Sequence, residues 1–155
     1  MSFIVAIDGP AGTGKGTITK LISKEMGLVN IDTGATYRCV ALYTLQNNIG
    51  VEETEKIIEE LPNINIDMKN ENGEQTVFLN GQDVTKEIRT PEVTKIVSFI
   101  SSIKEVRFAM VEVQRKLALG KDVIMEGRDI TTYVFPNADV KIYLDADENI
   151  RAERR

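Results

Sequence analysis

The sequence contains no histidine, no tryptophan and only one cysteine among its 155 residues. Without histidine it can form no Ser-His-Asp triad, no histidine metal site and no imidazole general base. Cys39 has no partner for an internal disulfide, and a small core residue in a reducing cytoplasm is its simplest interpretation. The N-terminal apolar run is too short for a signal peptide, and no run reaches membrane-spanning length. We therefore expect a cytoplasmic protein that has no membrane partner.

The chain also lacks an excess of positive charge. It has 24 acidic and 19 basic residues, which gives a net charge of −5. Because nucleic-acid binding depends on many lysine and arginine contacts to phosphates, this balance disfavours a nucleic-acid partner. An anionic small molecule can still bind, since the charge of the pocket decides that. The length and an apolar content of 42% indicate one domain with a substantial core.

A glycine-rich segment follows the first apolar run and precedes a helical pattern, the context that a phosphate-binding loop requires. Its glycines let successive backbone N–H groups point at an anion, and the following helix adds its positive dipole end. Lys15 supplies a mobile charge for the outer phosphates of a nucleoside triphosphate. The expected nucleotide-binding residues are Gly9, Pro10, Ala11, Gly12, Thr13, Gly14, Lys15, Gly16 and Thr17.

The ending of this segment departs from the usual pattern, which places serine or threonine directly after the lysine. Here Gly16 follows Lys15, and Thr17 comes next. A Lys-Gly-Thr ending is found in nucleoside monophosphate kinases of the adenylate kinase type. The departure therefore narrows the expected family to nucleoside monophosphate kinases of that type.

Strand and helix patterns alternate along the chain, which predicts an α/β fold with a parallel sheet and helices on both faces. We expect one domain over residues 1–155, with a small antiparallel β insert at about 62–87 that contains two Asn-Gly turns. Expected helices lie near residues 14–26, 35–46, 51–61, 90–100 and 106–117, and Asp147 caps a last one. Gly27 is expected to cap the end of the first helix, and Thr90 the start of the fourth, with Pro91 at its first position. An apolar stripe is expected on the fourth helix (Val93, Ile96, Val97 and Ile100), and the glutamates of the third are expected to form a solvated face. Expected strands of the main sheet lie near residues 3–7, 28–31, 123–125 and 140–144.

The chemistry-bearing motifs all follow expected strands of the main sheet. The glycine-rich segment follows the first strand, Asp32 the second, and Glu126-Gly-Arg-Asp129 the third. In open α/β sheets, ligands bind beyond the carboxyl ends of the strands. The motifs therefore converge on one expected site.

Several further motifs recur in a characteristic order, and together they resemble the bacterial cytidylate kinases from Phe3 to Arg155. That resemblance implies a P-loop fold of the nucleoside monophosphate kinase type. It also implies transfer of the γ-phosphoryl group of ATP to CMP and dCMP, which gives ADP and CDP or dCDP. The motifs are residues 32–38 (DTGATYR), 79–84 (LNGQDV), 88–93 (IRTPEV) and 127–130 (GRDI), with Ser98, Arg107 and the pair Gln114-Arg115.

The resemblance also implies which residues hold the acceptor nucleotide. Cytosine presents an exocyclic amine as donor, and a ring nitrogen and a carbonyl oxygen as acceptors. A carboxylate and a hydroxyl suit the amine, and an arginine fork suits the two acceptors. Uracil would place an oxygen against the carboxylate, so a preference for cytosine is expected. The implied CMP residues are Arg38 and Arg128 at the phosphate with Thr33 beside them, and Ser98, Arg107 and Asp129 at the base.

Plainer interpretations stay open for single residues. Ser98 and Arg107 can be solvated helix residues, Arg38 and Arg128 can be salt-bridge partners, and Asp32 can cap the following helix. Where the family usually continues with Gly-Thr-Val-Val, residues 131–134 read Thr-Thr-Tyr-Val, so we expect the bulkier Thr131 and the Tyr133 ring to alter the loop beside the base. Core packing is expected of three methionines and three tyrosines: Met68, Met110, Met125, Tyr37, Tyr43 and Tyr133.

The expected chemistry needs little proton transfer, because the attacking CMP oxygen is already ionised near neutral pH. Alignment and charge neutralisation then supply catalysis, with Lys15, Arg128 and Asp32 as catalytic residues. Mg²⁺ is expected on the donor phosphates, with Thr17 bound directly or through water.

Residue 155 lies where the family's lid helix begins, so we expect a truncated core of low activity. We also expect the protein to be a monomer. The alternatives are a nucleotide-binding fragment that is catalytically impaired, and a related small-molecule kinase on the same fold.

Overall fold

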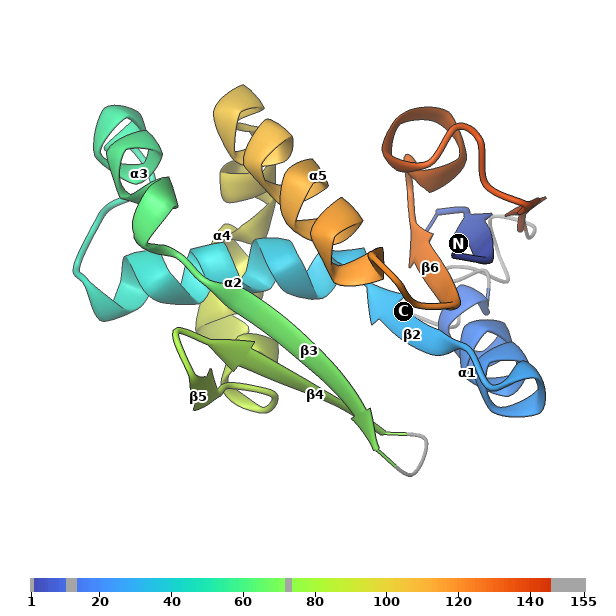
Figure 1. Cartoon of the computed structure of the whole chain (residues 1–155). Coiled ribbons are helices and arrows are strands. Elements are labelled where there is room, and N and C mark those ends of the chain that lie inside the picture. Colours follow the sequence, from blue (N-terminus) through green and yellow to red (C-terminus); the bar gives the residue numbers. More distant parts are fainter. Residues whose placement is uncertain (1, 11–13, 72–73, 146–155) are drawn as a thin grey trace. The chain divides into compact units, whose positions relative to one another are not determined.

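The computed structural model describes residues 2–10, 14–71 and 74–145 (Figure 1). Contacts within the chain divide it into two compact units. Unit 1 comprises Met1–Thr33 and Ala118–Arg155, and unit 2 comprises Gly34–Leu117. The expected cap at Asp147 and the last helix lie outside the described residues.

Unit 1 is built on a four-stranded sheet in the order β2-β6-β1-β7, and each neighbouring pair is parallel. Its strands coincide with short apolar runs, and Ala6, Ile7 and Ile124 are fully buried. Such runs are typical of parallel strands, which are covered on both faces. The parallel sheet predicted from the sequence is confirmed, with strands β1 (Ile4–Asp8), β2 (Val29–Asp32), β6 (Val123–Gly127) and β7 (Val140–Tyr143).

Helix α1 (Lys15–Met26) follows β1 and ends at the glycine that the sequence predicted as its cap. Gly27 has φ 66°, a left-handed conformation that glycine adopts without a steric penalty. Ile18 and Ile22 of α1 pack against a cluster of Val5, Ile7, Leu28 and Ile124, which Ile142 and Leu144 also contact.

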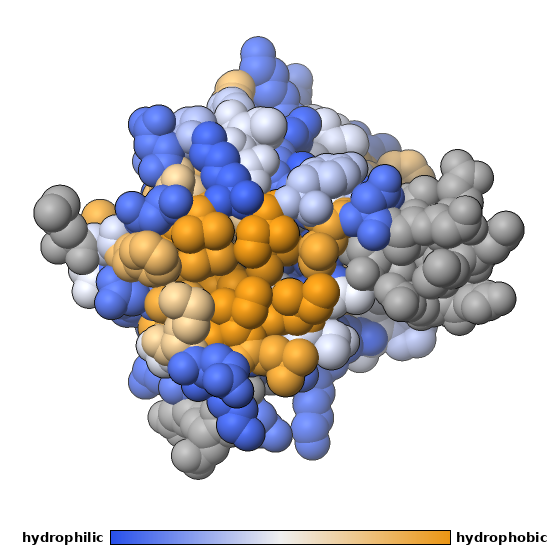
Figure 2. All heavy atoms as spheres, turned by 90° about the vertical axis from the view of Figure 1, so that its right-hand side faces the viewer, coloured by the Kyte–Doolittle hydropathy of each residue, from blue (hydrophilic) through white to orange (hydrophobic). Residues whose placement is uncertain are grey.

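The face of the molecule in Figure 2 carries a broad apolar area with hydrophilic side chains around it.

Unit 2 is mainly helical. Its core includes the fully buried side chains of Val93, Ile100, Val106 and Ile88. Of the predicted apolar stripe of the fourth helix, Val93 and Ile100 are buried, and Ile96 and Val97 are half-buried. The third helix is shorter than predicted, because it begins at Thr54 after a turn in which Glu53 accepts a hydrogen bond from the Gly50 amide (2.7 Å). The helices are α2 (Thr33–Gln46), α3 (Thr54–Glu60), α4 (Pro91–Ser102) and α5 (Lys104–Ala118), with short 3-10 turns η1 (Leu61–Asn63) and η2 (Glu87–Arg89).

The predicted antiparallel insert is present in unit 2 as strands β3 (Ile66–Glu71), β4 (Glu74–Leu79) and β5 (Gln82–Asp83). Asn80 and Gly81 join the last two strands with φ values of 49° and 83°, which a tight hairpin turn requires. After β5, the amide and hydroxyl of Thr85 donate to Asp83 (3.0 and 2.6 Å). The hydroxyl and then the amide hydrogen bond lower the pKa of that carboxyl.

The three methionines predicted to lie in the core are buried, Tyr37 and Tyr43 are half-buried, and Tyr133 is exposed. Met68, Met110 and Met125 are no more than 3% exposed, which confirms that they fill the core. Tyr133 is 45% exposed, so its predicted packing role is wrong. It lies in η3 (Ile130–Val134), a single π-helical turn that buries Ile130 and Val134 and leaves the intervening side chain in solvent.

Thr90 also differs from its predicted role as a side-chain cap of α4. Its hydroxyl donates to the Glu87 carbonyl (2.9 Å), and no side-chain capping hydrogen bond is present. The helix nonetheless begins at Pro91, because proline has no N–H that needs a partner at this position.

Membrane-crossing helices need ~20 consecutive apolar residues. None of the helices in the described part of the chain meets that requirement. With 15 residues, α5 is short of it, and lysine, arginine and glutamate side chains occur along its length.

Cys39 gives a direct test of the core of unit 2. The residue is fully buried, and burial raises the pKa of its thiol to about 12, against a smaller opposing influence of Arg89. Because the thiolate is the reactive form, we expect almost no labelling by iodoacetamide at pH 8 in the folded protein. Mass spectrometry should show complete labelling in denaturant at the same pH. Rapid labelling without denaturant would contradict the buried position.

Candidate functional site

Strands β1, β2 and β6 end at the same edge of the unit 1 sheet. In the parallel register, Asp8 lies opposite Gly127, and Asp32 lies opposite Glu126. The segments that leave this edge are the glycine-rich loop after β1, the start of α2 after β2, and Arg128-Asp129 after β6. The predicted convergence of three motifs therefore corresponds to one place in the structure.

The structure describes the two ends of the glycine-rich loop, Gly9-Pro10 and Gly14. The Gly9 amide donates to the Gly127 carbonyl (3.3 Å), which ties the start of the loop to the end of β6. Gly14 adopts a left-handed conformation (φ 86°) and precedes α1, whose first residue is Lys15. Residues 11–13 of the predicted loop (Ala11, Gly12 and Thr13) lie outside the described residues. The first amides of α1 thus face the same edge as the loop, where a helix N-terminus favours an anion.

One carboxylate lies beside the first turn of α1, and a second ends the neighbouring strand β2. Gly16 lies beside Glu126: a Cβ atom placed on this glycine would be 3.9 and 4.0 Å from the two carboxylate oxygens. Asp32 is half-buried at the end of the neighbouring strand, and Thr17 is exposed in the first turn of α1. Oxygen ligands of this kind suit Mg²⁺, which is usually held by one or two carboxylates together with substrate phosphates.

Thr33 is 5% exposed, and its hydroxyl donates to the Glu126 carbonyl (2.8 Å). This bond joins the start of α2 to the end of β6, so the Thr33 side chain stabilises the carboxyl edge of the sheet. A hydrogen bond to a CMP phosphate would require the hydroxyl to exchange that partner.

Arg128 and Asp129 follow β6 directly. The Arg128 side chain is exposed, and Asp129 is half-buried. The Asp129 carbonyl accepts hydrogen bonds from the amides of Tyr133 (2.8 Å) and Val134 (3.2 Å), which form the π-helical turn η3. Two of the three predicted CMP residues of unit 1, Arg128 and Asp129, are therefore carried by a short segment between a buried strand and a hydrogen-bonded turn.

The other predicted CMP residues belong to unit 2. One guanidinium nitrogen of Arg38 donates to the Ile88 carbonyl (3.1 Å) and to the Thr94 hydroxyl (2.9 Å), so α2 is joined to η2 and α4. Ser98 on α4 and Arg107 on α5 are both exposed. Their exposure is compatible with ligand binding and equally with the plainer interpretation of solvated helix residues.

The chain resembles known proteins over nearly its whole length. Residues 5–155 match the family model described as cytidylate kinase. A cytidylate kinase of Caldicellulosiruptor bescii is 52% identical over 151 residues, which are 97% of this chain and 67% of the relative. One from Fusobacterium nucleatum is 49% identical over 99% of this chain and 69% of the relative. A bifunctional pantoate ligase/cytidylate kinase of Prochlorococcus marinus is 50% identical over 98% of this chain and 30% of its own length.

This chain belongs to the cytidylate kinase family. It spans about two thirds of the length of the single-function relatives. The family membership predicted from the sequence is confirmed, and so are the parallel sheet and the antiparallel insert of the predicted fold.

Two carboxylates of this cytidylate kinase chain were missed as site residues by the sequence analysis. Glu126 had been noted only as part of a motif, yet its side chain lies beside the phosphate loop. Asp8 reads as the polar end of a strand, but its carboxylate accepts three hydrogen bonds from the segment after Asp129. Neither role has a local signal, because both depend on contacts between residues more than 100 positions apart.

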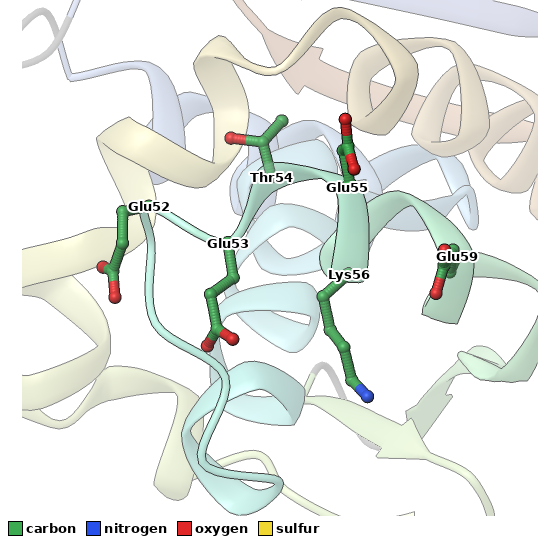
Figure 3. Close-up of a pocket in the computed structure, with 6 residues that line it drawn as sticks. All are labelled: Glu52, Glu53, Thr54, Glu55, Lys56 and Glu59. Carbon is green, nitrogen blue, oxygen red and sulfur yellow. The ribbon is translucent and has the colours of Figure 1, made fainter.

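An acidic hollow at the start of α3 is lined by none of the predicted site residues (Figure 3). Four glutamates and one lysine line it, and a surplus of negative charge repels nucleotide phosphates. Its lining residues are Glu52, Glu53, Thr54, Glu55, Lys56 and Glu59, which agrees with the predicted solvated acidic face.

The end of β6 leaves no room for a side chain at Gly127. A Cβ atom there would lie 2.5 Å from the Thr33 hydroxyl oxygen and 2.9 Å from the Ile130 methyl carbon. We expect Gly127→Ala to lower the free energy of unfolding by ~1–3 kcal/mol, the usual cost of overpacking. Urea unfolding followed by circular dichroism measures this.

Gly50→Ala is the matched control. The added carbon there would meet only the side chain of Glu52, which is exposed and can move aside. Equal stability of the Gly127→Ala protein and the wild type would show that the contact between β6 and Thr33 is looser than described.

Proposed function

We propose that this protein transfers the γ-phosphoryl group of ATP to CMP and dCMP, which gives ADP and CDP or dCDP. The observation that carries the proposal is that the phosphate loop and the Arg128-Asp129 segment leave one edge of one parallel sheet. The loop suits the phosphates of the donor, and the arginine suits a second anion. Membership in the cytidylate kinase family supports cytosine as the acceptor base.

The donor is held mainly by backbone groups in this proposal. Amides of the glycine-rich loop and of the first turn of α1 surround the ATP phosphates, and Lys15 neutralises their outer oxygens. Lys15 is half-buried at the start of α1, so its flexible stem lies close to the loop. These contacts align the γ-phosphoryl group for attack.

The acceptor is held mainly by side chains. Arg38 and Arg128 bind the CMP phosphate, whose ionised oxygen attacks the γ-phosphorus atom while the bond to the β-phosphate oxygen breaks. No general base is required, because that oxygen carries no proton near neutral pH. Catalysis rests on bringing two anions together and on neutralising their charge.

Cytosine is read by three side chains in the proposal. The carboxylate of Asp129 and the hydroxyl of Ser98 accept hydrogen bonds from the exocyclic amine. The guanidinium of Arg107 donates hydrogen bonds to the ring nitrogen and the carbonyl oxygen. The three residues come from the end of β6, from α4 and from α5. Uracil lacks the amine, so it leaves the Asp129 carboxylate without a donor.

Magnesium fits the oxygen-rich edge beside the loop. No group of three or more histidine, cysteine, aspartate or glutamate side chains that could hold a metal occurs in the described ranges, which is compatible with an ion held partly by nucleotide phosphates. Thr17, Asp32 and Glu126 would hold it directly or through water. When bound, the ion would supply positive charge to the β- and γ-phosphate oxygens.

The remaining proposals concern the setting of the enzyme. We propose that it acts in the cytoplasm as a monomer, with nucleotides as its partners. The buried thiol of Cys39 and the net charge of −5 suit a reducing compartment and a protein that does not bind nucleic acid.

The activity is tested by coupled ATP consumption with CMP, dCMP, UMP and AMP as acceptors. We expect turnover with CMP and dCMP, and at least about tenfold lower kcat/KM with UMP, because the base site lacks a partner for its O4. Faster turnover with AMP would favour a different small-molecule kinase. Binding of CMP by calorimetry without turnover would favour a nucleotide-binding fragment.

Asp129→Asn tests whether Asp129 recognises the cytosine base. An amide can no longer accept the cytosine amine with a full negative charge, and it can donate to the uracil O4. We expect the CMP/UMP ratio of kcat/KM to fall about 10- to 100-fold, as the loss of a charged hydrogen bond predicts. Ser102→Ala, which alters another exposed hydroxyl of α4, should leave the ratio unchanged. An unaltered ratio in Asp129→Asn would remove this residue from the base site.

A further inference from the structure

Asp8 is a buried carboxylate at the last position of β1, directly before the phosphate loop. It is 2% exposed, although aspartate is seldom so deeply buried without strong partners. One of its oxygens accepts from the Ile130 amide (2.8 Å). The other accepts from both the amide (2.8 Å) and the hydroxyl (2.6 Å) of Thr131. Both oxygens are therefore occupied by donors of the protein itself.

The two amides that Asp8 binds open the π-helical turn η3. The first N–H groups of a helical turn have no partner within the turn, and a carboxylate is among the best acceptors for them. Here the acceptor comes from a strand more than 120 positions away in the sequence. The amino end of η3 is therefore fixed to the end of β1.

Arg128 and Asp129 occupy the short link between two fixed points. Before them, Gly127 is paired in the ladder with Asp8 and accepts a hydrogen bond from the Gly9 amide (3.3 Å). After them, Ile130 and Thr131 are held by the Asp8 carboxylate. The backbone of one residue, Asp8, thus borders both the donor loop and the segment that we assign to the acceptor.

We propose that Asp8 is a positioning residue for the acceptor nucleotide: by holding the amides of Ile130 and Thr131, it sets where Arg128 and Asp129 lie relative to the phosphate loop. This inference rests on the proposed function, because it takes those two residues as CMP contacts. In this proposal Asp8 acts through Ile130 and Thr131, whose donor groups its two oxygens bind. Its charge strengthens all three hydrogen bonds, because an ionised acceptor binds N–H and O–H donors more strongly than a neutral one.

Thr131 contributes both a backbone donor and a side-chain donor to Asp8. Its amide (2.8 Å) and its hydroxyl (2.6 Å) bind the same carboxylate oxygen, and the hydroxyl bond is the shortest of the three. The threonine side chain therefore adds a second connection between this segment and β1.

The test compares Asp8→Asn, Thr131→Val and Thr131→Ser in steady-state kinetics with CMP, UMP and ATP varied separately. We expect Asp8→Asn to raise the KM for CMP and lower the CMP/UMP ratio by about tenfold or more, because a shift of ~1 Å at a reacting group can cost ~10²-fold. Thr131→Val removes only the hydroxyl bond, so its effect should be smaller and in the same direction. Thr131→Ser should retain wild-type values, and the KM for ATP should change less than twofold in all three (about the usual error of such comparisons).

Asp122→Asn is the matched control. Asp122 accepts the Phe3 amide (2.9 Å) at the opposite end of the same strand pair, so the control removes an equivalent charge away from the site. A purely structural role of Asp8 would lower stability and the fraction of active enzyme, but would leave both the KM for CMP and the CMP/UMP ratio at wild-type values. That result in Asp8→Asn and Thr131→Val would overturn the proposal.

Amide hydrogen exchange separates this proposal from the proposed function. In the intact wild-type chain, exchange at Ile130 and Thr131 should be slow, and Asp8→Asn should accelerate it, while Asp122→Asn should not. If wild-type protein fails to phosphorylate CMP but these amides respond as expected, the proposed function is wrong and the positioning contact is real. Unchanged exchange at Ile130 and Thr131 in Asp8→Asn would overturn the positioning role whatever the activity.

Discussion

Parallel pairing of β1, β2 and β6 is the constraint on which the candidate site depends. The register places Asp8 opposite Gly127 and Asp32 opposite Glu126, so three connections leave the sheet at one level. Backbone amides, carboxylates and an arginine are brought together there by hydrogen bonds of the sheet itself. A shift of one residue in β6 would reverse which of its side chains face each side of the sheet.

Crowding at the end of β6 shows how little freedom this edge has. Gly127 has no room for a side chain, because the Thr33 hydroxyl occupies the space while it donates to the Glu126 carbonyl. Asp8 then ties the following turn to β1 through three hydrogen bonds. Rigid backbone at this point suits phosphoryl transfer, where catalysis comes from alignment and fixed charge more than from proton transfer.

Sequence patterns predicted the elements of this site well, because those elements have local signals. A buried strand, a glycine turn and a helix start are contiguous, and the Asn80-Gly81 turn fixes the pairing of β4 with β5. The family resemblance added the order of motifs around Arg128 and Asp129. Gly27 and Pro91 marked a helix end and a helix start in agreement with the structure.

The contacts between these elements could not be predicted in the same way. Nothing near Asp8 in the sequence indicates that its partners are Ile130 and Thr131, since that contact exists only after the sheet has formed. The Thr33 hydroxyl was expected beside a phosphate, but it donates to a strand carbonyl. Tyr133 was expected to pack, yet a π-helical turn exposes it, and such turns have no reliable sequence signal.

In the proposed enzyme two nucleotides meet over the carboxyl edge of this sheet, one held by main-chain amides and the other by guanidinium groups. A crystal structure with ADP and CMP bound together tests this arrangement. We expect the ADP phosphates at Lys15 and the α1 N-terminus, with the CMP phosphate at Arg38 and Arg128 pointing toward them. Phosphates of the two nucleotides in separate cavities, with Lys15 and Arg128 facing different ligands that cannot react, would contradict it.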